Sequence, residues 1–191
     1  MTVTAKANDK VTTTVLSIEN FQYLTQERWE KLWECRREFL KNPNFNPLDC
    51  PEMNVEVALS WIRSRKMGID PYKLVSEPVL SIEEYRQELE KNRLLIETAK
   101  PLFNKFKDMA ILNSGFVLYL CDASGLFLLQ EGKMIRRNTD GLIWNESIIG
   151  TCVHSLCKQL KKPIQLLGPE HYCEELSDII GTAAPILDED G

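Results

Sequence analysis

The feature that most constrains this chain is a change of hydrophobic period near its middle. Up to residue 106 the apolar residues recur at helical spacing, but residues 116–132 read FVLYLCDASGLFLLQEG, two apolar runs separated by Asp122-Ala123-Ser124-Gly125. Apolar runs of this length around a glycine-containing turn indicate a β-hairpin. Because both faces of the runs are apolar, we expect the hairpin to lie inside a covered sheet.

Two helical patterns begin the chain. The first follows Thr25, a favourable N-cap residue, and ends before the Asn- and Pro-rich stretch at residues 42–51. The second runs from about Met53 to Met67 and is stopped by Gly68. Its spacing is expected to place four apolar residues on one inner side: Val55, Ala58, Trp61 and Ile62.

A third helical pattern begins at Ser81 and continues to residue 106. Ser81 and Glu84 have the spacing of a capping box, in which each side chain bonds the backbone N–H of the other residue. Pro101 has no backbone N–H to donate, so we expect it to kink or divide this helix.

The part of the chain after the hairpin alternates between the two periods. It predicts a helix over Asn145–Leu160, a strand over Pro163–Gly168 and a last strand within GTAAPILDEDG (residues 181–191), whose apolar end is Ala184–Leu187. Asp190-Gly191 is a hairpin-turn dipeptide, so a further strand is expected beyond it and the sheet is expected to be C-terminally incomplete. An antiparallel sheet flanked by helices, preceded by a helical arm, is an α+β fold.

Composition narrows the functional classes. The chain of 191 residues is 43% hydrophobic and 27% charged, as in soluble globular proteins. Its net charge of −5 lacks the basic excess that binding to a phosphate backbone requires. No stretch approaches the roughly 18 apolar residues of a membrane span, so we expect a cytoplasmic protein without membrane contact, in which the six cysteines are buried thiols.

Two motifs resemble a known family. SWIRSRKMGIDP at residues 60–71 resembles the opening of sigma-54-dependent activators of the acetoin-responsive type, and residues 150–191 resemble the second half of their GAF sensor domain. Cys152 stands where the family commonly has Asn, and Ser155 where it commonly has Gly. The identity of the effector is therefore not inferred from the acetoin-responsive members. The positions that match one by one are Gly150, Thr151, Glu170, His171, Tyr172, Ala184, Pro185 and Ile186.

The resemblance implies a sensory module rather than an enzyme. It divides the chain into a flexible N-terminus (1–20), a helical arm (21–80) and a C-terminally incomplete GAF-like domain (81–191). In the family such a domain binds a small-molecule effector, without another cofactor, and governs an AAA+ ATPase. No G-x-x-x-x-G-K-[ST] motif is present here, so sigma-54 polymerase and DNA are expected to be partners only of regions outside this chain. Homodimerisation is expected through the flanking helices.

The candidate effector site centres on His171. This residue directly follows a predicted strand, where loops commonly line ligand clefts, although Glu170 and His171 are equally well explained as a brace for the next short helix. The remaining candidates are Tyr172 beside it and four residues from the preceding segments: Tyr119, Trp144, Asn145 and Cys152.

Two alternative functions are open from the sequence. One is a thiol- or metal-based redox sensor or enzyme, with Cys152, Cys157, His171 and Cys173 as ligands or nucleophile. Cys152 and Cys157 are five residues apart, so on one helix they do not share a face well, and Cys152 with His154 is a worse pair. The other alternative is a stand-alone protein-interaction module that acts through its helical arm.

Overall fold

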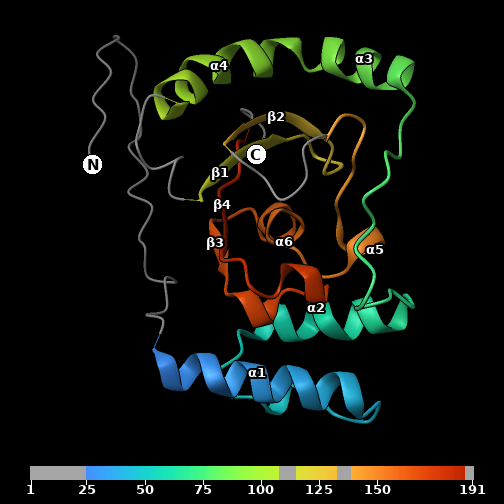
Figure 1. Ribbon diagram of the computed structural model, residues 1–191, viewed down its shortest axis with the longest axis vertical. Coiled ribbons are helices and arrows are strands. Elements are labelled where there is room, and N and C mark those ends of the chain that lie inside the picture. Colours follow the sequence, from blue (N-terminus) through green and yellow to red (C-terminus); the bar gives the residue numbers. More distant parts are fainter. Residues whose placement is uncertain (1–24, 108–114, 133–138, 188–191) are drawn as a thin grey trace.

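The computed structural model describes residues 25–107, 115–132 and 139–187, and it arranges them in layers (Figure 1). Helices α3 and α4 form one outer layer, two small antiparallel sheets and α6 lie inside, and α2 and α1 form the opposite side. Helices combined with antiparallel strands confirm the predicted α+β class. The elements are α1 Gln26–Lys41, η1 Pro47–Asp49, α2 Val55–Lys66, α3 Ile82–Lys91, α4 Arg93–Lys107, β1 Val117–Cys121, β2 Phe127–Gly132, α5 Glu146–Ile149, α6 Val153–Leu160, β3 Ile164–Leu166, η3 Gly168–Glu170, η4 Glu174–Leu176 and β4 Gly181–Ala183.

The ends of α1 and α2 confirm the predicted cap and stop residues. Thr25 Oγ1 accepts a hydrogen bond from the N–H of Arg28 at 3.1 Å. Asn54 caps α2 by accepting from the N–H of Glu56 at 2.9 Å. Gly68 ends α2 with a φ of +73°, a conformation that glycine adopts without steric cost.

The inner face of α2 differs from the prediction in one position. Val55 is 60% exposed, whereas Val57, Trp61 and Ser64 are buried at i, i+4 and i+7. Val55 lies two positions before Val57, about 200° around the helix axis, and therefore off this face. The residues that face inward include two serines, Ser60 and Ser64, which a purely apolar pattern does not identify.

The third predicted helix forms as two helices, α3 and α4. The capping box of Ser81 and Glu84 is present as predicted. The helix divides at Asn92, which closes α3, and not at Pro101, which lies inside α4. Proline removes only the hydrogen bond to the carbonyl of Glu97, and both residues lie on the exposed side of α4, where water can bond that carbonyl.

The predicted hairpin is confirmed as the antiparallel pair β1–β2. Asp122 organises its turn, because Oδ1 accepts from the N–H groups of Ser124 at 2.8 Å and Leu126 at 3.0 Å. Gly125 has a φ of +90°, and a Cβ there would lie 2.0 Å from the carbonyl oxygen of Trp144. The turn therefore lies directly against the segment that precedes α5.

The strands do not form one covered sheet in the described residues. β3 and β4 pair with each other, with Ile164 opposite Ala183, as a second two-stranded sheet. The last strand forms at the start of the predicted stretch as β4, but it ends at Ala183, so the predicted apolar end at Ala184–Leu187 lies outside the strand. Pro185 has no N–H for a strand ladder, which accounts for the earlier end. The predicted flexible segment 1–20 and the Asp190-Gly191 turn lie outside the described residues.

The predicted helix Asn145–Leu160 is divided into α5 and α6. Gly150 has a φ of +74°, and a Cβ there would lie 2.5 Å from the ring of Tyr172. This backbone conformation ends α5, and Cys152 becomes the extended residue immediately before α6 rather than a residue within a helix. The break places the side chains of residues 150–155 in directions that a continuous helix would not allow.

Three apolar cores hold the layers together. The first joins Leu32 and Phe39 of α1 and Trp61 of α2 to Leu156 of α6 and Leu166 of β3, so the region predicted as an arm shares its core with the C-terminal half. The second lies between β2, α5 and η4 and contains Phe127, Trp144, Ile149, Cys152, Cys173 and Leu176. The third packs α3 and α4 on the hairpin through Tyr85, Ile96, Phe103, Leu120, Leu126 and Leu128.

Candidate functional site

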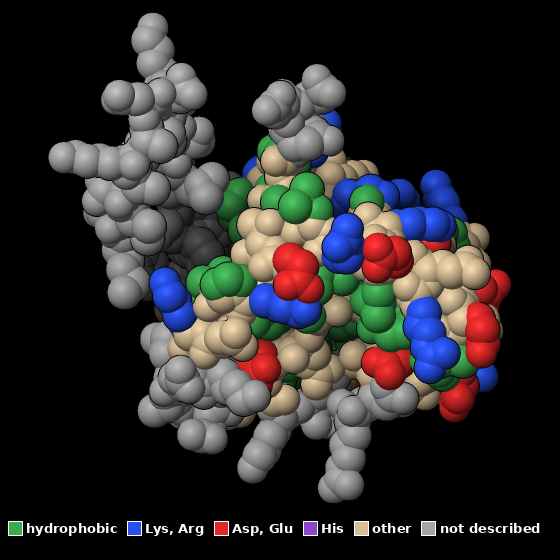
Figure 2. Space-filling view, turned by 90° about the horizontal axis from the view of Figure 1, so that it is seen from above, with side chains coloured by type: hydrophobic (Ala, Val, Ile, Leu, Met, Phe, Trp, Pro, Cys, Tyr) green, Lys and Arg blue, Asp and Glu red, His purple; other side chains and the backbone are tan. Residues whose placement is uncertain are grey.

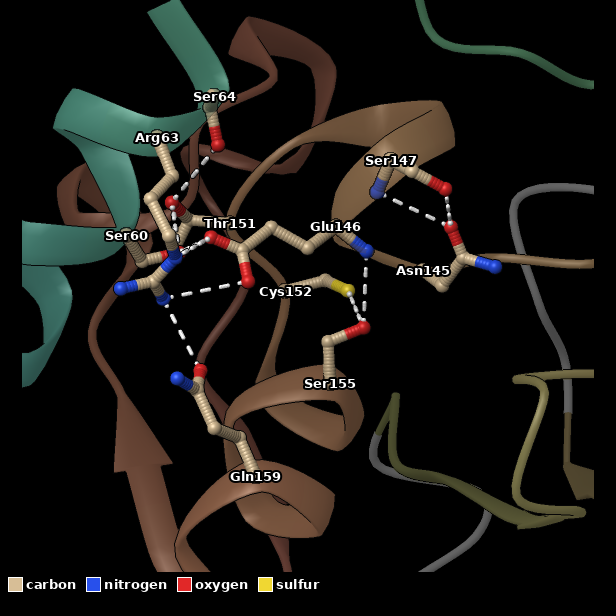
Figure 3. A network of polar contacts seen from close by, with 10 residues as sticks. All are labelled: Ser60, Arg63, Ser64, Asn145, Glu146, Ser147, Thr151, Cys152, Ser155 and Gln159. Carbon is tan, nitrogen blue, oxygen red and sulfur yellow. Dashed lines mark hydrogen bonds and ion pairs between the residues drawn. The ribbon is translucent and has the colours of Figure 1, made fainter. Parts of the chain in front are cut away.

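The two motif segments of the sequence meet in space (Figure 3). Ser60 Oγ lies 2.7 Å from Thr151 Oγ1 and 2.8 Å from Glu146 Oε1, and Ser64 Oγ lies 3.5 Å from the same threonine oxygen. Ser60, Ser64 and Thr151 have no exposed surface, so these hydroxyls satisfy one another away from water. We call the contact between α2 and residues 146–159 the helix junction.

A charged pair extends the helix junction toward the surface. Arg63 Nε lies 2.8 Å from Glu146 Oε1, and Arg63 Nη2 lies 3.2 Å from Glu146 Oε2, a two-point arrangement that orients both side chains. Arg63 Nη2 also donates to Gln159 of α6 at 3.0 Å (Figure 3). Glu146 is the first residue of α5, so its negative carboxylate also interacts favourably with the positive end of the helix dipole.

The loop Glu170–Tyr172, which we call the EHY loop, is held by α1 and α2. Trp61 Nε1 donates to the carbonyl of Glu170 at 2.8 Å. Arg36 is 2% exposed and donates to three carbonyls, those of Pro169, His171 and Tyr172, the last at 2.9 Å. A buried guanidinium of this kind fixes the path of the backbone rather than presenting a charge to solvent.

Glu170 is buried and ion-paired. Its Oε2 accepts from the N–H of Leu167 at 2.8 Å, and its Oε1 lies 3.5 Å from Nη2 of Arg28. Burial raises the pKa of the Glu170 carboxyl, and the hydrogen bond from Leu167 and the charge of Arg28 act in the opposite direction. These contacts describe a structural brace between α1 and η3.

His171, the central sequence candidate, is 4% exposed. Its Nδ1 lies 3.3 Å from the carbonyl oxygen of Gly168, which requires that Nδ1 carries the proton. Burial lowers the pKa of His171 to about 4, so the ring is neutral at physiological pH. Tyr172 lies edge-on to Phe39 at 6.2 Å between ring centroids, in the first core. The contacts of His171 and Tyr172 are therefore structural ones, as the brace interpretation expects.

The other sequence candidates gather elsewhere, around Phe127. The Phe127 ring lies 5.1 Å from Tyr119, 5.3 Å from Trp144 and 6.3 Å from His154, in edge-to-face arrangements. We call these four rings the aromatic cluster. Trp144 is fixed further by its Nε1, which donates to the carbonyl of Val75 at 2.9 Å. Burial raises the pKa of the Tyr119 hydroxyl, which keeps this side chain neutral.

Cys152 lies beside the aromatic cluster with a histidine that the sequence reading dismissed. Its Sγ is 3.5 Å from His154 Nε2 and 3.2 Å from Ser155 Oγ. His154 Nε2 also contacts the carbonyl oxygen of Trp144. Burial alone raises the pKa of the Cys152 thiol, but the charge of His154 and the hydrogen bonds from His154 and Ser155 outweigh it and hold this pKa below its ordinary value.

The four residues of the metal alternative do not converge. Cys152 and Cys173 belong to the second core and Cys157 to the first, while His171 lies on the EHY loop. In residues 25–107, 115–132 and 139–187, no three His, Cys, Asp or Glu side chains are grouped as a metal site requires. All six cysteines are free thiols.

Sequence reasoning missed several residues of the site. Ser60, Arg63 and Ser64 were quoted as a motif, and their spacing places them on one helix face, which is the signal that could have identified the helix junction. Arg36 carried no such signal, because its carbonyl partners are more than 130 residues away. His154 was missed because Cys152 was assigned to a helix interior.

Comparison with known proteins finds similarity to part of a transcriptional activator. No protein-family model and no solved structure matches it. It is 30% identical over 152 residues to the acetoin dehydrogenase operon transcriptional activator AcoR of Bacillus subtilis (strain 168), a match that covers 75% of this chain and 25% of the activator. None of the helices in the described ranges combines the length and apolar content that crossing a bilayer requires. The chain is therefore related, over three quarters of its length, to part of a transcriptional activator that is about four times as long as the matched region.

Proposed function

We propose that this chain is the small-molecule-sensing region of a sigma-54-dependent transcriptional activator, with a GAF-like domain that controls ATPase and DNA-binding regions outside the chain. Its similarity to a transcriptional activator supports the regulatory role. The observation that carries the proposal is the helix junction, in which Ser60 and Arg63 of α2 bind Glu146 next to the aromatic cluster. A sensor requires such a physical link between a ligand site and a flanking helix.

The aromatic cluster is the proposed effector site. It combines apolar rings with a few polar groups, the Tyr119 hydroxyl and the Cys152–His154 pair, which is the usual make-up of a small-molecule pocket. Its rings come from β1, β2, the segment before α5, and α6. Asn145 lies at its margin, where it caps α5 by accepting from the N–H of Ser147 at 3.1 Å.

Three consecutive residues connect this site to α2. Trp144 belongs to the aromatic cluster, and its N–H donates to the carbonyl of Gly125 in the hairpin turn. Asn145 donates to the carbonyl of Ser124 at 3.0 Å, and Glu146 holds Arg63. A displacement of Trp144 by an effector therefore moves the backbone that carries Glu146. The mechanism is a population shift, in which the effector favours one arrangement of the junction.

The proposal also includes the cellular compartment and the surface through which the protein dimerises. The protein acts in the cytoplasm, without chemistry on the effector. It pairs as a homodimer through the outer face of α3 and α4, where Leu94 and Leu102 are 82% and 53% exposed. Figure 2 views the molecule from that side and shows hydrophobic patches between charges of both signs. Ion pairs such as Lys100 with Glu97 at 2.6 Å supply part of that charge.

A thermal-shift screen tests the effector site. The chain is heated with small alcohols, ketones, carboxylic acids and methylated amines, because a ligand that binds only the folded state raises its melting temperature. We expect at least one class to stabilise the wild type and to lose most of this effect in Tyr119→Phe. Tyr72→Phe is the matched control, since Tyr72 is 61% exposed and lies outside the three cores.

The screen also has a result that contradicts the proposal. If every stabilising compound acts equally on Tyr119→Phe, Cys152→Ser and Tyr72→Phe, the aromatic cluster is not the effector site. Regulation is tested in the longer activator. Its ATPase activity is expected to respond to the same compounds, and Arg63→Met is expected to weaken that response while the compounds still bind.

A further inference from the structure

The Cys152 sulfur lies at the start of α6 with two polar groups directed at it. Cys152 is the residue before the helix, with extended backbone angles of φ −140° and ψ 153°. His154 Nε2 is 3.5 Å from the sulfur, and Ser155 Oγ is 3.2 Å from it (Figure 3 shows the Ser155 contact). The first turn of a helix of eight residues adds the positive end of its dipole.

The groups around the Cys152 sulfur can bond either protonation state of it. His154 Nε2 carries a hydrogen, because it contacts the carbonyl of Trp144, which cannot donate. Ser155 Oγ accepts the N–H of Glu146 at 2.9 Å, and it can accept a second hydrogen bond from the Cys152 thiol or turn its own hydroxyl hydrogen toward a thiolate. Formation of the thiolate therefore leaves no group at these contacts without a partner.

Among residues 25–107, 115–132 and 139–187, few other charges lie near the pair. The titratable groups of these ranges that interact with it include the neutral thiol of Cys121 and the neutral ring of His171. The nearby Glu146 carboxylate is held by Arg63. The other neighbours are the apolar members of the second core and the rings of the aromatic cluster. The negative sulfur and the positive imidazole therefore find their main partners in each other.

We propose that Cys152 and His154 form a thiolate–imidazolium pair that makes Cys152 a site of reversible oxidation by small peroxides. This inference goes beyond effector sensing and does not depend on it, because the reaction needs only the groups named here. Cys152 is 2% exposed, while His154 and Ser155 are half-buried and separate it from solvent. That enclosure restricts the oxidant to molecules about the size of hydrogen peroxide.

The reaction is balanced by the residues present and the peroxide. The Cys152 thiolate attacks one peroxide oxygen, an S–O bond forms and the O–O bond breaks. The leaving hydroxide takes the proton of the His154 imidazolium and departs as water, leaving a neutral imidazole and a sulfenic acid. The sulfur is oxidised by two electrons, and the peroxide is reduced by two. When a local opening exposes the sulfur, two molecules of an external thiol restore Cys152, with release of one water and one disulfide.

Other cysteines of the chain lack this environment. Burial raises the pKa of Cys121 to about 12, and burial also raises the pKa values of Cys35, Cys157 and Cys173. Since the thiolate is the nucleophile, these side chains are slow to oxidise. Oxidation of Cys152 adds an oxygen beside Ser155, whose hydroxyl bonds the N–H of Glu146, so the modification acts on the helix junction.

The test follows sulfenic acid on the isolated chain. Wild type, His154→Gln and the control Cys157→Ser are freed of reductant without oxygen, treated with hydrogen peroxide for a set time and then unfolded in urea that contains dimedone, which reaches buried sulfenic acids once the chain is unfolded; the adduct is located by peptide mass spectrometry. We expect the adduct at Cys152 to form about tenfold faster than at any other cysteine, because the thiolate is the nucleophile. We expect His154→Gln to slow it by a similar factor, and Cys157→Ser to leave it unchanged.

Faster labelling at another cysteine, or an unchanged rate in His154→Gln, would overturn the proposal. A second measurement does not depend on whether His154→Gln folds. The ultraviolet absorbance of thiolate is titrated against pH in folded wild type and in Cys152→Ser. We expect a thiolate in the wild type below the pH at which an ordinary cysteine ionises, about 8.5, and its loss in the variant. Superimposable titration curves would show that no such thiolate exists.

Discussion

Acidification will destabilise the protein through the burial of His171. Burial lowers the pKa of this ring to about 4, the charges of Arg36 and His154 act in the same direction, and the carbonyl of Gly168 opposes them. A histidine in the unfolded chain has a pKa of about 6.5. The unfolded state therefore binds more protons between these two values, and stability falls as pH falls through that window.

The size of the effect follows from the two pKa values. Relative to neutral pH, proton linkage at His171 removes about 2 kcal/mol at pH 5 and about 3 kcal/mol at pH 4, with little further loss below the folded pKa. This is a large share of the roughly 5–15 kcal/mol that stabilises a typical domain. Glu170 acts in the opposite direction, because burial raises its pKa and the folded state then gains stability as pH falls.

A variant separates the His171 contribution from the others. Urea unfolding of wild type and His171→Gln is compared at about pH 7, 5 and 4, where glutamine keeps an N–H for the Gly168 carbonyl but does not titrate. Wild type is expected to lose about 2 kcal/mol more than the variant between pH 7 and pH 5. Contributions from Glu170 are common to both proteins and cancel. Parallel pH profiles would refute the reasoning, because they would mean that His171 is protonated as easily in the folded state as in the unfolded state.

Three further predictions test the contacts that build the site. Arg36→Met removes the donor to three backbone carbonyls and is expected to lower the free energy of unfolding in urea by about 3 kcal/mol; an unchanged value would contradict the assigned role. Arg63→Met and Glu146→Gln, made singly and together, are expected to show a coupling of about 1 kcal/mol, because the pair is partly exposed; strictly additive losses would count against it. Gly150→Ala is expected to cost about 2 kcal/mol more than Gly68→Ala, since both residues have a positive φ, +74° and +73°, but only a Cβ at Gly150 would meet an aromatic ring, at 2.5 Å; equal losses would show that the ring moves aside freely.

Local signals predicted much of the secondary structure. The cap at Thr25, the capping box at Ser81 and the hairpin around Asp122 each depend on residues within four positions of one another, so their physics is visible in a short window. The division at Asn92 instead of Pro101 shows the limit of this reasoning. Pro101 is tolerated because the carbonyl it leaves unbonded is on the exposed side of α4, and exposure is a property of the folded molecule.

The site was harder to predict because it is assembled across the chain. Arg63 and Glu146 are 83 residues apart, and no periodicity relates them. The Cys152–His154 pair was hard to predict for a different reason, which is the backbone conformation of Gly150. The apolar spacing of residues 145–160 suits a continuous helix, but the close packing of Tyr172 requires a positive φ at Gly150, and that break sets the direction of the cysteine. The tertiary contact decides the local conformation, so the local pattern alone misleads.

The contact between Arg36 and the EHY loop also determines how late during translation the core around α1 and α2 can be completed. Arg36 and its first carbonyl partner, Pro169, are 133 residues apart. At 5–20 residues per second, a ribosome needs roughly 7 to 27 s to complete that interval. During this time α1 and α2 have emerged without the segment that completes their core, and the apolar faces of Leu32 and Trp61 are uncovered. The nascent chain is therefore a client for holding chaperones until residues 156–172 arrive, and slowing translation within this interval is expected to lower the yield of folded protein.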